Sequence, residues 1–216
     1  TGAGTSGECS VSNNRTLSLR FPIALVLSIC CLTTAVWADF ETGMDAYDRE
    51  DYATAVREWQ PLAEQGDAQA QLHLGLLYAN GDGIPQDYAT AHQWYEQAAA
   101  QGYAMAQYNL GLLYDTGDGV PQDYAKARQW YEQAAARGYA MAQTNLGVLY
   151  RSGHGVPQND MRAYMWFSLA AARSTGNLQK PAADSRDNIS HRMPPAQLVE
   201  AQWLANRCEA RQFKGC

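Results

Sequence analysis

The sequence predicts an all-α fold: a right-handed α-solenoid of helix-turn-helix repeats that ends in a C-terminal helical cap. The first observation is a repeat. The stretch "LGLLYANGDGIPQDY" at 74–88 recurs as "LGLLYDTGDGVPQDY" at 110–124 and "LGVLYRSGHGVPQND" at 146–160, a period of 36 residues. Within each unit, apolar residues fall at helical spacing, and glycine and proline separate two such stretches. One helix pair cannot bury its apolar face alone, so the units are expected to stack.

The N-terminal region, 1–38, is predicted to be an upstream segment followed by a signal peptide. Arg15 and Arg20 precede an uncharged run, "FPIALVLSICCLTTAVWA", that ends in small residues. A basic region, a short apolar core and small residues at the cleavage site are typical of secretory signals. We expect cleavage after Ala38, no membrane insertion after that cleavage, and a periplasmic or secreted protein of the bacterial cell envelope. Retention of the run as a membrane anchor is the alternative.

The mature part is acidic and has few cysteines. Removing Arg15, Arg20 and Glu8 from the 16 basic and 22 acidic residues leaves 14 and 21, a net charge of −7. Nucleic-acid binders show a basic face, so we expect no nucleic-acid partner. Only Cys208 and Cys216 of the five cysteines remain. Because an oxidising compartment favours pairing, we predict a disulfide between them.

The first helix of each repeat is predicted from its apolar spacing, over about 68–79 in the first unit. Gly75 lies in the middle of this helix, where glycine costs about 1 kcal/mol relative to alanine. Gly111 and Gly147 repeat the cost in the next two units. We expect these glycines to allow a close approach of the partner helix, which is rich in alanine.

A loop and a second helix, over about 88–101, complete the unit. Gly81 is expected to end the first helix in the left-handed conformation, and Asp87 to cap the next one after Pro85 stops the chain from resuming a helix. The second helix is expected to bury Ala91, Ala98 and Trp94 and to stop at a glycine.

These signals divide the mature chain into three parts. A leading helix pair is expected over 39–66, and three repeats follow at 67–102, 103–138 and 139–174. The period then stops, and 175–216 is expected to form a cap of two helices, the second opened by Pro195 in its first turn.

The repeated pattern resembles the Sel1-like repeat family. It is carried by "AQAQLHLGLLYANGDGIPQD", "AMAQYNLGLLYDTGDGVPQD" and "AMAQTNLGVLYRSGHGVPQN", each followed by A-x-x-W and a pair of alanines before glycine. The family is related to the tetratricopeptide repeats, and its members are chiefly adaptors and scaffolds that bind other proteins. The resemblance therefore implies an exported scaffold for an unidentified protein or peptide.

The alternative is an enzyme that binds or hydrolyses β-lactams or cell-wall fragments, as has been suggested for secreted, cysteine-rich relatives. Those relatives carry a cysteine pair in each repeat, whereas 39–207 contains none. "DTG" at 115–117 imitates an aspartic-protease signature but is one version of a repeat loop, and it has no second acid. The four histidines are scattered without metal-ligand spacing. We expect no catalytic residue, metal or cofactor.

A variable stripe on the first helices is predicted to bind the partner. Positions equivalent to 71, 74, 75 and 78 hold the same residue in every unit, which fits packing, whereas the opposite face varies. The resemblance places that variable face on the concave wall of the solenoid. We call it the recognition stripe; it consists of Met105, Tyr108, Asn109, Leu112, Met141, Thr144, Asn145 and Val148. Methionine, an aromatic ring and amides suit peptide recognition, but simple packing of the apolar members against neighbouring units is the alternative.

Overall fold

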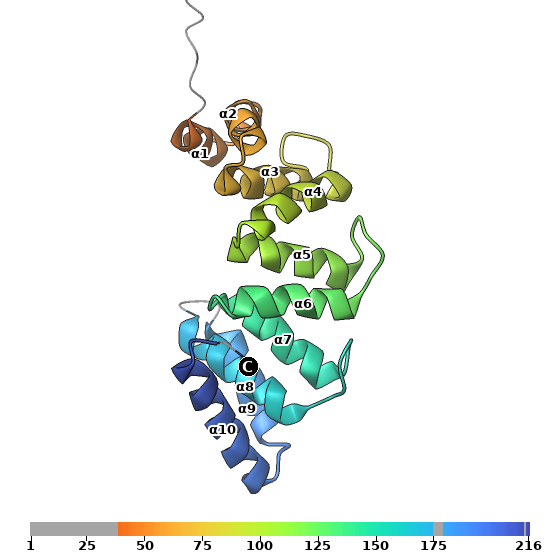
Figure 1. The fold of residues 1–216 in the computed structure, drawn as a ribbon, viewed down its shortest axis with the longest axis vertical. Coiled ribbons are helices and arrows are strands. Elements are labelled where there is room, and N and C mark those ends of the chain that lie inside the picture. Colours follow the sequence, from red (N-terminus) through yellow and green to blue (C-terminus); the bar gives the residue numbers. More distant parts are fainter. Residues whose placement is uncertain (1–38, 175–178, 214) are drawn as a thin grey trace, which may run out of the picture. The chain divides into compact units, whose positions relative to one another are not determined.

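The computed structural model describes residues 39–174, 179–213 and 215–216, and every regular element in them is an α-helix (Figure 1). The signal-peptide prediction falls on 1–38 and lies outside the described residues. The ten helices are α1 (Phe40–Asp48), α2 (Tyr52–Glu64), α3 (Ala68–Asn80), α4 (Tyr88–Ala100), α5 (Ala104–Thr116), α6 (Tyr124–Ala135), α7 (Ala140–Ser152), α8 (Asp160–Arg173), α9 (Gln179–Ser190) and α10 (Pro195–Ala210). None of these helices is long and apolar enough to cross a membrane.

Consecutive helices pack against one another from α1 to α8. The pair α1 and α2 leads, and each of the three repeats contributes the next pair, as Figure 1 shows. The all-helical stack of helix pairs confirms the predicted fold class.

The loop inside each repeat forms as the sequence predicts. Gly81 ends α3 in the left-handed region, with φ of 78°. The Asp87 carboxylate then accepts the N–H groups of Ala89 and Thr90 and so caps α4. The loop closes on itself because the N–H of Asp87 donates to the carbonyl of Tyr78 at 2.9 Å. Asp123 caps α6 in the same way, and the side-chain oxygen of Asn159 caps α8 by accepting the N–H of Arg162.

The glycine inside the first helix of each repeat faces an aromatic ring, not the alanines that the sequence suggested. A Cβ on Gly75 would lie 2.5 Å from the ring of Tyr95 on α4. Tyr95 is 2% exposed, whereas Trp94, which was expected to be buried, is partly exposed. The same contact recurs between Gly111 and Tyr131 and between Gly147 and Phe167. In each repeat the aromatic residue that meets the glycine follows the tryptophan directly in sequence, so the two side chains point about 100° apart around the helix.

A second contact joins each repeat to the one before it. Gly83, in the first loop, has φ of 67°, and a Cβ there would lie 2.5 Å from the Cβ of Tyr52 on α2. Gly119 meets Tyr88 and Gly155 meets Tyr124 in the same manner. The loop of each repeat therefore rests on the first residue of the preceding second helix. We call this contact the loop joint.

The last two helices cover the C-terminal end of the stack, as predicted. Both α9 and α10 pack on α8, which also contacts α7. Five consecutive residues of α8 are buried, from Ala163 to Phe167. Trp166 is 4% exposed here, unlike its partly exposed equivalents Trp94 and Trp130, because the cap encloses α8.

Candidate functional site

The recognition stripe is most open on α5. Met105 and Leu112 are 39% and 37% exposed, among the few large apolar side chains at the surface. Tyr108 lies between them and is almost fully buried, with its ring 5.8 Å from that of Tyr131 and 5.2 Å from that of Tyr139. The stripe on α5 thus consists of two exposed apolar side chains on either side of a fixed aromatic ring.

Asn109, also on α5, carries an unsatisfied polar group. Its Nδ2 is inaccessible to solvent and has no hydrogen-bond partner among the described residues. A buried amide without a partner is costly, so such groups are uncommon unless something else satisfies them.

On α7 the stripe is more enclosed. Met141 and Val148 are partly buried and pack against the main apolar core, as the packing alternative requires. The hydroxyl of Thr144 donates to the carbonyl of Ala140 at 3.0 Å, so it is already paired within α7. The aliphatic members on α7 are therefore partly structural.

Four members of the stripe line a single cavity of about 120 Å³. Tyr108 comes from α5, and Met141, Thr144 and Asn145 come from α7. The remaining lining residues are Ser174, at the end of α8, and Pro181 and Ala182, in the first turn of α9. At roughly 150 Å³ a protein cavity holds a benzene ring, so this one has room for about one small apolar side chain.

The sequence did not reveal the contribution of α9. The position of α9 depends on how the cap folds back on α8, and no residue spacing encodes that packing.

Hydroxyl groups next to the cavity stay in their neutral form. Burial raises the pKa of the Tyr108 hydroxyl above its usual range, and the neighbouring amide of Asn145 offsets part of the rise. Burial also raises the pKa of Tyr131, whose hydroxyl donates to the carboxylate of Asp115 at 3.0 Å. These groups can therefore donate hydrogen bonds throughout the physiological pH range.

The remaining candidates from the sequence take structural positions. Asp115 and Thr116 of "DTG" form the last turn of α5, where Asp115 holds Tyr131. In the part of the chain that the structure describes, His, Cys, Asp and Glu do not gather in groups of three that could hold a metal ion.

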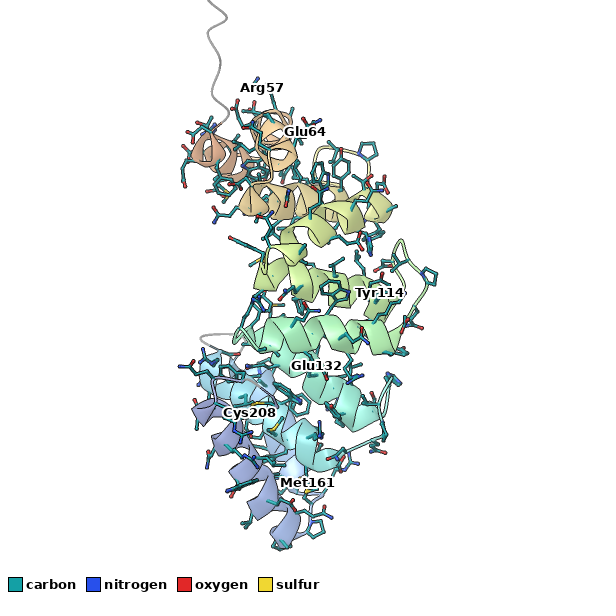
Figure 2. The ribbon with its side chains drawn as sticks, viewed as in Figure 1. Arg57, Glu64, Tyr114, Glu132, Met161 and Cys208 are labelled. Carbon is teal, nitrogen blue, oxygen red and sulfur yellow. A yellow bond between two sulfur atoms is a disulfide. The ribbon has the colours of Figure 1, made fainter. Side chains whose placement is uncertain are left out.

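The two mature cysteines lie together in the cap. Cys208, near the end of α10, is paired with Cys216, and their Cα atoms are 5.6 Å apart (Figure 2). This separation is typical of disulfides. Formation of the bond in the exported protein remains a prediction.

Comparison with known proteins identifies the repeats. A family model described as "Sel1 repeat" matches residues 68–103, 104–139 and 140–174. Each matched repeat begins one residue after the start predicted from the period, and the last one ends at the predicted residue, 174. No curated protein matches.

Two solved structures are similar to this chain. A Sel1 repeat protein from Oxalobacter formigenes is 28% identical, with a TM-score of 0.61 over 79% of this chain and 75% of that one. The protein c5321, a protective antigen present in uropathogenic Escherichia coli strains that displays an SLR fold, is 23% identical, with a TM-score of 0.55. The match covers 81% of this chain but only 46% of c5321, and it concerns the fold alone.

Proposed function

Because residues 68–174 are three Sel1 repeats, this chain is a Sel1-repeat protein, and we propose that it is an exported scaffold that binds another protein or a peptide through the recognition stripe. Sel1-repeat proteins are generally protein-interaction scaffolds. Export is proposed from the basic, then apolar, then small-residue order of the N-terminal region. The proposed location is the periplasm or the outside of the cell.

The cavity lined by Tyr108, Met141, Thr144 and Asn145 carries the proposal. It combines an apolar wall with an amide, and this combination lets a site hold one side chain and fix the backbone beside it. A peptide side chain of modest size fits the volume of about 120 Å³. Met105 and Leu112 extend the apolar surface along α5, so a peptide that fills the cavity continues over both residues.

Asn109 supplies a reason for a polypeptide partner in particular. Its unpartnered Nδ2 is closed to solvent, so it reaches an acceptor when the partly buried side chain turns outward, and a backbone carbonyl is an acceptor that every peptide offers. Asn145 occupies the equivalent position one repeat later, 36 residues along the chain. Two amides at one repeat spacing would fix an extended peptide at two points along its backbone.

The test compares the mature protein, residues 39–216, with the double variant Asn109→Ala/Asn145→Ala as bait in an envelope extract. Captured proteins are identified by mass spectrometry, and the affinity of the captured partner is then measured for each bait. We expect roughly tenfold weaker binding or more, since two hydrogen bonds of about 1 kcal/mol each are lost. The melting temperature should stay within a few degrees, because Nδ2 of Asn109 has no partner to lose and Asn145 loses only its contact with the hydroxyls of Tyr108 and Tyr131.

The matched control is Gln93→Ala/Gln129→Ala, which removes two exposed amides from α4 and α6, again one repeat apart. This control should bind like the unchanged protein. If the Asn variant binds with full affinity, or loses its fold, the stripe is a packing surface and the proposal fails.

A further inference from the structure

Charge is distributed unevenly along the mature chain. Residues 39–102 hold 12 acidic and 2 basic side chains, whereas 103–216 hold 9 acidic and 12 basic ones. A mature chain with a net charge of −7 therefore has a basic C-terminal part, residues 103–216. Such an asymmetry steers partners of opposite charge toward one end of the molecule.

Three of these basic side chains line one cavity between the third repeat and the cap. It has a volume of about 190 Å³, space for roughly six water molecules, and lies between α8 and α10. We call it the arginine pocket; its lining residues are Arg162, Met165, Leu204, Arg207, Cys208, Arg211, Gly215 and Cys216. No Asp or Glu side chain is among them, so the pocket joins three guanidinium groups to a wall of aliphatic and sulfur atoms.

Two of the three arginines, Arg162 and Arg207, are held in place by aromatic residues, and none of the three is paired with an acidic side chain in the described part of the chain. Arg162 donates to the hydroxyl of Tyr150 at 3.1 Å and lies over its ring at 5.4 Å. Arg207 lies over the ring of Trp203 at 4.9 Å. Within the described residues, the ion pairs involve other cations, and none includes Arg162, Arg207 or Arg211. Guanidinium groups that are already oriented lose little freedom when they bind a carboxylate.

An exposed apolar strip on α10 leads into the pocket. Val199 is 66% exposed and Trp203 is 54% exposed, and Arg207 and Arg211 follow at the same four-residue spacing. Residues four apart are neighbours on a helix surface, so the strip passes from apolar to aromatic to cationic. Exposed tryptophan and arginine side chains next to each other are typical of protein-binding hot spots.

We propose that the arginine pocket binds a carboxylate side chain of an acidic polypeptide segment, while an aliphatic neighbour in that segment packs on Trp203 and Val199. The pocket supplies the charge complementarity and the strip supplies the apolar contact. This surface is formed by α8 and the cap and shares no residue with the recognition stripe. If the arginine pocket does not bind acidic peptides, the proposed function of the recognition stripe is unaffected.

The probe is a synthetic acetylated tetrapeptide amide, Leu-Glu-Glu-Leu, compared with Leu-Gln-Gln-Leu of the same shape and no charge. Binding to the mature protein is followed by calorimetry and by changes in the fluorescence of Trp203, with the Trp203→Phe variant as the reference. The acidic peptide should bind saturably and the amide peptide should not. Binding should weaken as salt is raised, because the contact is between opposite charges.

Two substitutions that each remove one positive charge, Arg207→Gln and Arg211→Gln, should each weaken binding about tenfold, since a hydrogen bond to a charged group is worth about that factor. The control is Arg49→Gln, which removes an equal charge from an exposed position in the leading helix pair and should have no effect. All three side chains are exposed, so the variants should melt like the unchanged protein.

Three results would overturn the proposal: equal binding of both peptides, equal losses in the control and pocket variants, or full displacement of the peptide by millimolar inorganic phosphate. The last result would identify a general anion site in place of a carboxylate site.

Discussion

Replacing Gly111 with alanine should destabilise the protein, although alanine is the better helix former. In the structure, the new Cβ would lie 2.5 Å from the ring of Tyr131. That ring cannot turn aside, because it is fully buried and its hydroxyl is held by Asp115 at 3.0 Å. Contacts this short force side chains and backbone to shift, and overpacking of this kind costs about 1–3 kcal/mol.

The net effect of Gly111→Ala follows from three contributions. Strain costs about 2 kcal/mol, and weakening of the hydrogen bond to Asp115 costs about 1 kcal/mol. The higher helix propensity of alanine returns about 1 kcal/mol. The free energy of unfolding should therefore fall by about 2 kcal/mol, and the melting temperature by roughly 4–8 °C for a chain of this size.

The control is the same substitution in a Tyr131→Leu background, measured by thermal and urea unfolding. A leucine side chain can rotate away from the new methyl group, so Gly111→Ala should there become neutral or stabilising by up to about 1 kcal/mol. A rise in melting temperature in the unchanged protein would refute the reasoning. So would an equal loss in both backgrounds, since the ring would then not be the cause.

Three further predictions concern the cap, the N-terminus and pH. The disulfide between Cys208 and Cys216 should leave no free thiol in an Ellman assay of the denatured, unreduced protein, and closing this short loop should stabilise the fold by roughly 2.5 kcal/mol; two equivalents of thiol would contradict it. N-terminal sequencing of exported protein should begin at or within two residues of Asp39, and recovery of the full-length chain in the inner membrane would show that the signal is not cleaved. Burial of His73 lowers its pKa below 6.5, so the unfolded chain binds the proton more readily than the folded one. Stability should therefore be unaffected by His73 above pH 6.5 and should fall as the pH drops below it; a His73→Gln variant with an unchanged loss between pH 7.5 and 5 would exclude this cause.

Local chemistry explains why the loops could be predicted from sequence. A left-handed glycine at Gly81 and a capping carboxylate at Asp87 act on backbone groups within a few residues of themselves. Their effect does not depend on the rest of the fold. Because the sequence repeats every 36 residues, the same prediction applies to the loop of each later repeat.

The partner of the helix glycine needed tertiary information. Trp94 and Tyr95 are adjacent in sequence, and the tryptophan is the more obvious candidate for burial by size. Which of the two meets Gly75 depends on the rotation of α4 about its axis when it packs on α3. One signal was available: an aromatic residue recurs at 95, 131 and 167, as regularly as the glycines do.

The two cavities could not be predicted from the sequence. The cavity next to Asn145 is closed by Pro181 and Ala182, and the arginine pocket joins Arg162 to α10. Both depend on the way α9 and α10 dock on α8. The residues of the recognition stripe could be predicted because they share one helix face. The cavity that some of them line could not be predicted.

The loop joint has a consequence for how chains of this kind change in length. Each repeat carries a loop glycine that rests on the tyrosine behind it, and the first two repeats also carry a tyrosine, Tyr88 or Tyr124, that receives the glycine of the repeat ahead. The third repeat has Asp160 at this position. A tandem copy of residues 104–139, inserted after 139, would find a matching surface at each of its ends. Gene duplication could thus lengthen the protein by whole 36-residue steps without new adjustments in its neighbours, and each step would add another pair of variable surfaces on which selection can act.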